Sequence, residues 1–262
     1  IKEYPLIFPE KSEQQKIASC LSSLDEYLTA QSNKLEALKA HKKGLMQQLF
    51  PAEGETVPKL RFAEVRDNGE WKKKTIDEIA QVTSGGTPDS TNEKFWNGDI
   101  PWINSGELNN KRIYSVSNGI TSLGLEESST KLIPPRCVLI GLAGQGKTRG
   151  TAAINYIELC TNQSIASIHP NNYVFNSEFL YQRINSMYDQ LRALSTGEGG
   201  RGGLNLQIIK SIEVRLPSLD EQQNIADCLS SLDELITAQA EKIEALKTHK
   251  KGLMQGLFPS TN

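Results

Sequence analysis

Residues 13–50, EQQKIASCLSSLDEYLTAQSNKLEALKAHKKGLMQQLF, recur in the same chain at residues 221–258, and this repeat determines the architecture. The two copies are offset by 208 positions, and 29 of their 38 positions are identical. A long internal repeat indicates one structural unit used more than once. The chain therefore consists of one element, a different middle region, and the same element again.

Each copy is predicted to form one long helix, over about residues 12–50 and 220–258. Ser12 and Asp220 are the predicted N-caps, because each is followed three residues later by a glutamine, as in a capping box. Prolines lie just outside both copies, where helices end. At about 1.5 Å per residue, each helix is roughly 57 Å long, which corresponds to about seventeen base pairs of DNA.

Apolar residues recur along both copies at alternating steps of four and three, which is typical of a coiled-coil seam. Gln31 and Lys42, with their copies Gln239 and Lys250, interrupt the seam, and such polar residues commonly fix register. The middle region follows the first helix and precedes the second, so pairing within the chain predicts an antiparallel coiled coil. A second interpretation is two surface helices packed on a globular core, but such helices need a wider apolar stripe than this two-position seam. The predicted seam residues are Ile17, Leu21, Leu24, Leu28, Leu35, Leu38, Leu45, Leu49, Ile225, Leu229, Leu232, Ile236, Ile243, Leu246, Leu253 and Leu257.

The middle region is predicted to be a mixed α/β domain, because short β-prone segments alternate with turn residues. Two helices are predicted, over residues 75–82 and 177–195, the second capped by Ser177. Three loops are rich in glycine and small polar residues. The predicted strands are 100–104, 112–116, 138–142, 152–156 and 164–169, the loops are 84–88, 141–150 and 196–203, and the predicted domains are 1–58, 59–216 and 217–262.

No catalytic or metal-binding constellation is found in the sequence. Residues 141–148 fit the phosphate-loop pattern, but residues 149–157 continue as a β-like segment instead of opening a helix. We therefore expect no nucleotide hydrolysis. The three histidines include the two repeat copies His41 and His249, and no cysteine stands at metal-ligand spacing.

Composition is ordinary for a chain of the cytoplasm: 37% of residues are apolar and 23% are charged. No run approaches the ~18 apolar residues of a membrane span, and no secretory signal precedes residue 10, so cytoplasmic location is expected. The four cysteines are therefore expected to be reduced, buried thiols. The net charge of −2 does not by itself indicate nucleic-acid binding, although residues 59–215 carry a net charge of +2.

The order of motifs resembles the specificity subunit of type I restriction–modification systems over nearly the whole chain. The junction at its C-terminal side is the most specific part, because its tail, Pro217 with Glu221-Gln222-Gln223, recurs as Pro9 with Glu13-Gln14-Gln15. The segments that match the family's target-recognition domain are Trp71, 79–88, 100–103, the loop near Gly146-Lys147, 160–163 and 204–212.

The resemblance implies a DNA-sequence-reading adaptor and no enzyme. In this family each recognition domain reads one half of a split double-stranded DNA target, and the helix pair sets the spacer. Modification (methyltransferase) subunits bring S-adenosylmethionine, restriction (motor–nuclease) subunits bring ATP and magnesium, and this chain is expected to bind no cofactor. Because the full subunit carries two recognition domains, the sequence corresponds either to a fragment or to a natural half-subunit.

Loops held by a rigid core are the expected DNA readers. Arginine and glutamine can make bidentate contacts with bases, whereas lysine and threonine more often hold phosphate. Arg201 stands among five glycines in the 196–203 loop, and such a permissive backbone suits a segment that orders against a partner. The predicted DNA-binding residues are Ser84, Thr87, Asn104, Gln145, Lys147, Thr148, Arg149 and Arg201.

A function of another class competes with this one: a coiled-coil scaffold whose middle domain binds a protein or carbohydrate ligand. The net charge of −2 suits that alternative. Specific, salt-sensitive DNA binding separates the two classes.

Overall fold

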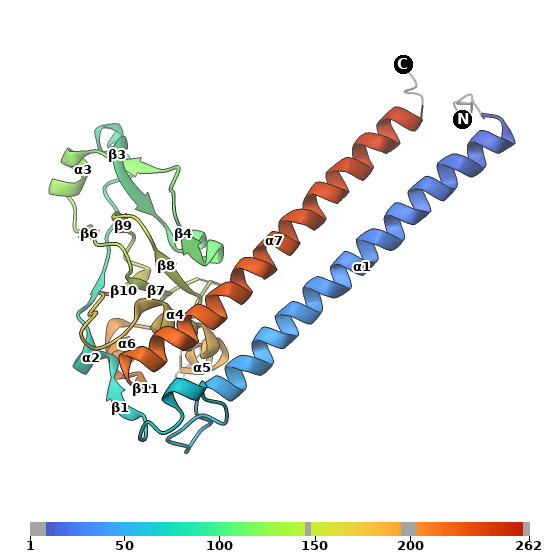
Figure 1. Cartoon of the computed structure of the whole chain (residues 1–262). Helices are drawn as coiled ribbons and strands as arrows, with labels where there is room; N and C mark the ends of the chain where they lie inside the picture. The colour runs from blue at the N-terminus through green and yellow to red at the C-terminus, as the bar shows by residue number, and fades with distance from the viewer. Residues whose placement is uncertain (1–8, 145–147, 195–202, 259–262) are drawn as a thin grey trace. The chain divides into compact units, whose positions relative to one another are not determined.

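The structure, a computed structural model, describes residues 9–144, 148–194 and 203–258 (Figure 1). The chain divides into two compact units. One is a helix pair formed by Ile1–Leu45 and Ser230–Asn262, and the other, the middle unit, is Met46–Leu229. The mixed α/β middle with two long flanking helices confirms the predicted fold class.

The repeat forms two helices of 39 residues each, α1 (Lys11–Leu49) and α7 (Leu219–Leu257). Both begin one residue earlier than predicted, so Ser12 and Asp220 lie inside the first turns and the predicted caps are wrong. At α7 the Ser218 hydroxyl accepts a hydrogen bond from the Glu221 backbone N–H at 3.4 Å. Ser218 and Asp220 are both good cap residues, and the helix extends back to the first of them.

The helix pair is antiparallel, as its cross-helix ion pairs show. Lys42 Nζ lies 2.5 Å from Asp233 Oδ1, and Lys250 Nζ pairs with Asp25 Oδ1. Each Lys–Asp pair is the repeat counterpart of the other, because both residues of one pair lie 208 positions from those of the other. The Lys42 and Asp233 side chains are 10% and 19% exposed, so this pair is shielded from water.

A glutamine pair joins the two helices between these ion pairs. Gln239 Nε2 donates to the backbone oxygen and to Oε1 of Gln31, both at 3.0 Å. Lys242 Nζ lies 5.4 Å from the centre of the Tyr27 ring, a cation–π distance. Apart from Leu257, every predicted seam residue is buried or half-buried.

In the described part of the middle unit the strands form three sheets. The pairs β4–β8 and β3–β9 are parallel, and the other strand pairs are antiparallel. The five-stranded sheet has the order β2 (Val82–Ser84), β10 (Ile165–Ile168), β7 (Val138–Gly141), β8 (Ala152–Asn155) and β4 (Arg112–Ile113). The four-stranded sheet has the order β5 (Gly119–Ile120), β3 (Trp96–Ile103), β9 (Leu159–Thr161) and β6 (Leu132–Ile133), and β1 (Lys72–Thr75) pairs with β11 (Glu213–Leu216).

The predicted strands are present, but several are shorter than expected. Residues 112–116 contribute only the two residues of β4, because Tyr114 leaves the sheet and is exposed. The predicted helix 75–82 is only the four residues of α2 (Ile76–Ile79), capped by Thr75. Val82 instead begins β2, which pairs with β10.

The predicted helix 177–195 is two helices, α4 (Ser177–Ser186) and α5 (Tyr188–Leu194), with Met187 between them. Asn176, and not Ser177, is its cap: Asn176 Oδ1 accepts from the Phe179 N–H at 3.1 Å. Two further helices are α3 (Ser122–Glu126) and α6 (Leu206–Ser211). The 3₁₀ segments are Ala63–Val65, Glu93–Phe95 and Ser105–Asn110.

The core lies between the two larger sheets and under α4, which contacts β7 and β8. Burial raises the pKa of the Cys137 thiol to about 12 and that of Cys160 to about 11. Cys20 is exposed, so the expectation that all four thiols are buried is wrong. The core cluster comprises Ile103, Leu108, Ile113, Ile133, Cys137, Leu139, Ala153, Leu159 and Ile165.

Candidate nucleic-acid interface

The turn 161–164, between β9 and β10, organises one end of the middle unit. The backbone oxygen of Thr161 accepts from the Gly86 N–H at 2.9 Å, and that of Ser164 accepts from the Leu142 N–H at 2.8 Å. The Asn162 N–H donates to the backbone oxygen of Ile103 at 3.0 Å. This turn therefore joins the 84–88 loop, the end of β3 and the β7–β8 hairpin.

The 84–88 loop is held so closely that only glycine fits. A Cβ on Gly85 would lie 1.8 Å from the Thr161 backbone oxygen, and one on Gly86 would lie 2.3 Å from Ser129 Oγ. The Gly86 backbone oxygen also accepts from Trp102 Nε1 at 3.1 Å. Trp102 is buried and anchors the loop through this bond.

Thr87, a predicted DNA-binding residue, lies at the exposed side of this loop. Its hydroxyl donates to Gln163 Oε1 at 2.6 Å, which links the tip of the loop to the turn 161–164. Ser84, the last residue of β2, is half-buried and pairs with Ala166 of β10. The structure therefore brings Ser84 and Thr87 together at one end of the five-stranded sheet.

Asn104, another predicted DNA-binding residue, has a structural role in this fold. Its Oδ1 accepts from the Gly106 N–H at 2.8 Å and so caps the 3₁₀ helix that follows β3. Its Nδ2 lies 3.4 Å from Glu107 Oε1. Burial raises the pKa of the Glu107 carboxyl. Asn104 is exposed beside the turn 161–164, and its Oδ1 takes part in the cap.

The glycine-rich hairpin between β7 and β8 contains Thr148 and Arg149, both half-buried. The Gly150 N–H donates to the Gly141 backbone oxygen at 2.9 Å, which closes the base of the loop. Strand β8 follows the loop, as the sequence indicated, where a phosphate loop would open a helix. Predicted residues Gln145, Lys147 and Arg201 lie outside the described residues.

Sequence reasoning did not predict that Gln163 belongs to this end of the domain. The signal that could have found it is a pair of amide residues, Asn162 and Gln163, directly after a buried strand. The contact between Gln163 and Thr87 joins positions 76 residues apart. Such a contact depends on tertiary packing and is not visible in a local pattern.

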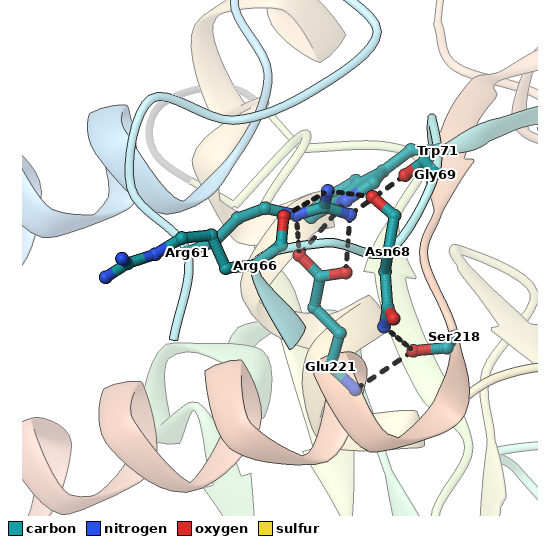
Figure 2. A network of polar contacts seen from close by, with 7 residues as sticks. All are labelled: Arg61, Arg66, Asn68, Gly69, Trp71, Ser218 and Glu221. Atoms are coloured by element: carbon teal, nitrogen blue, oxygen red, sulfur yellow. Dashed lines mark hydrogen bonds and ion pairs between the residues drawn. The ribbon is translucent and has the colours of Figure 1, made fainter. Parts of the chain in front are cut away.

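A second polar network, far along the chain from these loops, forms a junction at the first turn of α7 (Figure 2). Glu221 is 1% exposed and accepts from Arg61 Nε and Nη2, both at 2.8 Å. Trp71 Nε1 donates to the same carboxylate at 3.2 Å. Because both oxygens of Glu221 have partners, the buried charge is compensated.

Arg61 also holds the segment that leads into the domain. Its guanidinium donates to the backbone oxygens of Arg66, Asn68 and Gly69, so all of its N–H directions are used (Figure 2). Asn68 Nδ2 donates to Ser218 Oγ at 3.1 Å. The network therefore ties residues 61–71 to the start of α7 inside the middle unit.

The same junction has an aromatic side. The ring centroids of Phe50 and Trp71 are 6.2 Å apart in an edge-on arrangement, and Phe179 of α4 lies 5.4 Å from Phe50. Gln222, fully buried next to Glu221, accepts from the Asn176 N–H at 2.8 Å. The last residues of α1, the domain and the first turn of α7 are thus one packed body.

The first repeat copy carries the same residues in a different environment. Glu13 and Gln14 are exposed, whereas their counterparts Glu221 and Gln222 are 1% and 0% exposed. Gln14 Nε2 donates to the Pro9 backbone oxygen, and Gln222 Nε2 makes the equivalent bond to Pro217. The local geometry of the motif is therefore conserved between copies, and only the packing around it differs.

Among the described residues no group of three or more His, Cys, Asp or Glu side chains could hold a metal ion. In the same residues, no helix is both long enough and apolar enough to cross a membrane.

Comparison with known proteins identifies one family and several relatives that this chain resembles. The model of the family "Type I restriction modification DNA specificity domain" matches residues 68–248. The MjaIX specificity subunit of Methanocaldococcus jannaschii, a type I restriction enzyme subunit, is 33% identical over 194 residues, which are 72% of this chain and 44% of that protein. The EcoR124I/EcoR124II specificity subunit of Escherichia coli is 30% identical over 177 residues, 66% of this chain and 43% of that protein. The chain thus spans less than half the length of these two relatives.

Solved structures share the fold. The crystal structure of a type I restriction–modification S subunit from M. genitalium superposes with a TM-score of 0.65 at 17% identity, covering 97% of this chain and 62% of that chain. The HsdS subunit from Thermoanaerobacter tengcongensis gives a TM-score of 0.62 at 14% identity, covering 97% and 63%. With the family model covering most of its middle unit and much of α7, this chain belongs to the family of type I restriction–modification DNA specificity domains.

Proposed function

We propose that this chain reads one half of a bipartite double-stranded DNA target. In this proposal the loops at the turn 161–164 contact the DNA, and the helix pair serves as spacer and as docking platform for modification subunits. The chain contributes sequence recognition, and the chemistry belongs to its partners.

The observation that supports this proposal is the convergence of loops around the turn 161–164. The 84–88 loop, the end of β3 and the β7–β8 hairpin each bond to that turn through the backbone. Gly203, which follows the glycine-rich 196–202 segment, lies near Leu142, since a Cβ on it would be 3.6 Å from the Leu142 backbone oxygen. Polar loops on a rigid core are a common arrangement for reading base edges and holding phosphates.

The proposed partners follow from the relatives. Two relatives are named as specificity subunits of type I restriction enzymes, and a solved chain with a TM-score of 0.68 comes from work on complex assembly of a type I system. For this chain we infer modification and restriction subunits as partners in the cytoplasm. S-adenosylmethionine, ATP and magnesium would be bound by those subunits.

Equilibrium binding to DNA tests the proposal. The chain, with the subunits that co-purify with it, is titrated with a pool of random duplexes and with single sequences selected from that pool, at several salt concentrations. We expect selected duplexes to bind at least about 10³-fold more tightly than unselected ones at physiological salt, with affinity falling as salt rises. Equal, weak binding of every duplex would favour the protein- or carbohydrate-binding scaffold.

The predicted contact at Arg201 can be assigned by the same titrations. If Arg201 reads a base, Arg201→Ala relaxes specificity at one target position and costs about 1–3 kcal/mol on the selected duplex only. If Arg201 holds phosphate, Arg201→Ala weakens all duplexes together and lowers the salt slope by about one unit. Wild-type behaviour on every duplex removes Arg201 from the interface.

A further inference from the structure

Within the turn 161–164, three of the four residues serve the fold. Thr161 is buried, and its backbone oxygen accepts from both the Gly86 N–H and Thr130 Oγ1. Asn162 is half-buried, and its Oδ1 accepts from the Ser164 N–H at 3.1 Å. Gln163 is the exposed member, and its side chain makes no contact that the turn itself requires.

The Gln163 amide is nevertheless held in one orientation. The Thr87 hydroxyl donates to Oε1 at 2.6 Å, so the oxygen faces Thr87 and the amide nitrogen faces away from it. Thr87 is itself fixed, because Gly85 and Gly86 pack against the backbone of Thr161 and the 129–130 segment. A long exposed side chain normally gives up rotamer freedom on binding, and this anchor removes part of that cost in advance.

The bond to Thr87 leaves the Gln163 amide with both a donor and an acceptor. A carbonyl oxygen has two lone pairs, and Thr87 occupies one of them. Oε1 therefore keeps a second acceptor position, and Nε2 keeps its N–H donors. These are the two groups with which glutamine pairs bidentately with adenine N6 and N7 in the major groove. Among the described residues, Thr87 is the partner that the structure gives to this side chain.

We propose that Gln163 is a base-reading residue that recognises an adenine in the major groove, and that Thr87 is the residue that positions its amide. The inference rests on the proposed function. It assigns a specificity role to the exposed residue of the turn to which the 84–88 loop and the β7–β8 hairpin bond.

The test compares base preferences, position by position, on a pool of random duplexes. The proteins are the full chain with its co-purifying subunits as wild type, Gln163→Ala, Thr87→Val and Thr87→Ser, with Gln15→Ala as a matched control at an exposed glutamine of α1. We expect Gln163→Ala to lower the preference for adenine at one target position by about 5- to 150-fold and to leave other positions unchanged. Thr87→Val should weaken the preference at that same position, whereas Thr87→Ser, which keeps the hydroxyl, and Gln15→Ala should retain it.

Three results overturn the inference while the proposed function stands. They are an unchanged preference profile for Gln163→Ala, an equal loss of affinity for all duplexes, and loss of preference for a base other than adenine. A loss in Thr87→Val at a position different from that of Gln163→Ala removes the positioning role of Thr87. If the wild type itself shows no base preference, the proposed function fails, and this inference fails with it.

Discussion

Replacement of Glu221 by alanine should lower the free energy of unfolding much more than the same replacement at Glu13, its counterpart in the first repeat copy. Glu221 is 1% exposed and compensates the Arg61 guanidinium, whose side chain is 10% exposed. Breaking a buried ion pair by removing one partner costs about 3–5 kcal/mol, because the remaining charge stays buried. Arg61 keeps its bonds to the backbone oxygens of residues 66, 68 and 69, so we expect the lower end of that range, about 3 kcal/mol.

The matched control is Glu13→Ala, which removes the same residue from the first copy of the motif. Glu13 is exposed, and exposed substitutions usually stay within about 0.5 kcal/mol. The free energy of unfolding is measured by urea titration, followed by circular dichroism and by tryptophan fluorescence. In thermal scans, about 3 kcal/mol corresponds to a fall of roughly 6–12 °C in the melting temperature of the middle unit.

Equal shifts of the unfolding transition in Glu221→Ala and Glu13→Ala would contradict a stabilising role of the buried Glu221–Arg61 pair. A double variant gives a second check, because removing both charges leaves no buried charge without a partner. Arg61→Met combined with Glu221→Met should be more stable than either single variant. If the double variant is the least stable of the three, the carboxylate and the guanidinium do not act as a pair.

Three further predictions concern the helix pair, the 84–88 loop and the thiols. Leu38→Asp puts a charge into the seam and should destabilise the helix pair by several kcal/mol, seen as a lower melting transition by circular dichroism; an unchanged transition contradicts the coiled coil. Gly85→Ala forces a Cβ to within 1.8 Å of the Thr161 oxygen and should cost about 1–3 kcal/mol by urea unfolding, whereas a neutral result means that the loop is not packed as described. Burial raises the pKa of the Cys137 thiol from 9.0 to about 12, so this thiol stays protonated in the folded protein but ionises above pH 9 in the unfolded chain. The free energy of unfolding should therefore fall as the pH rises from 9 toward 12. Cys137→Ala should flatten that fall, and a thiol reagent at neutral pH should modify exposed Cys20 well before Cys137; the reverse order contradicts the assigned burial.

The repeat made the two long helices predictable to within one residue at each end. Heptad spacing and near-identity of the copies are local signals, and they also predicted the polar interruptions, of which Gln31 and Gln239 contact each other directly. The cap residues were harder, because Ser218 and Asp220 both qualify and only the three-dimensional fit selects Ser218. The same ambiguity between neighbouring polar residues explains why Ser177 was predicted as the cap of α4 although Asn176 is the cap.

The candidate site was only partly predictable. Glycine content identified the 84–88 and 141–150 loops, but nothing local shows that both bond to the turn 161–164. For the same reason the sequence did not show that the Asn104 side chain caps a 3₁₀ helix or that Gln163 contacts Thr87. Side-chain direction in a loop is set by distant neighbours, which a one-dimensional pattern does not contain.

The paired ions of α1 and α7 have a geometric consequence. Asp25–Lys250 and Lys42–Asp233 exchange places when the helix pair is turned end over end about an axis near Gln31 and Gln239. Because the two helices run in opposite directions, their macrodipoles oppose each other along the pair. Between the two ion pairs, the helix pair therefore has the same order of charged and polar contacts whichever end it is followed from.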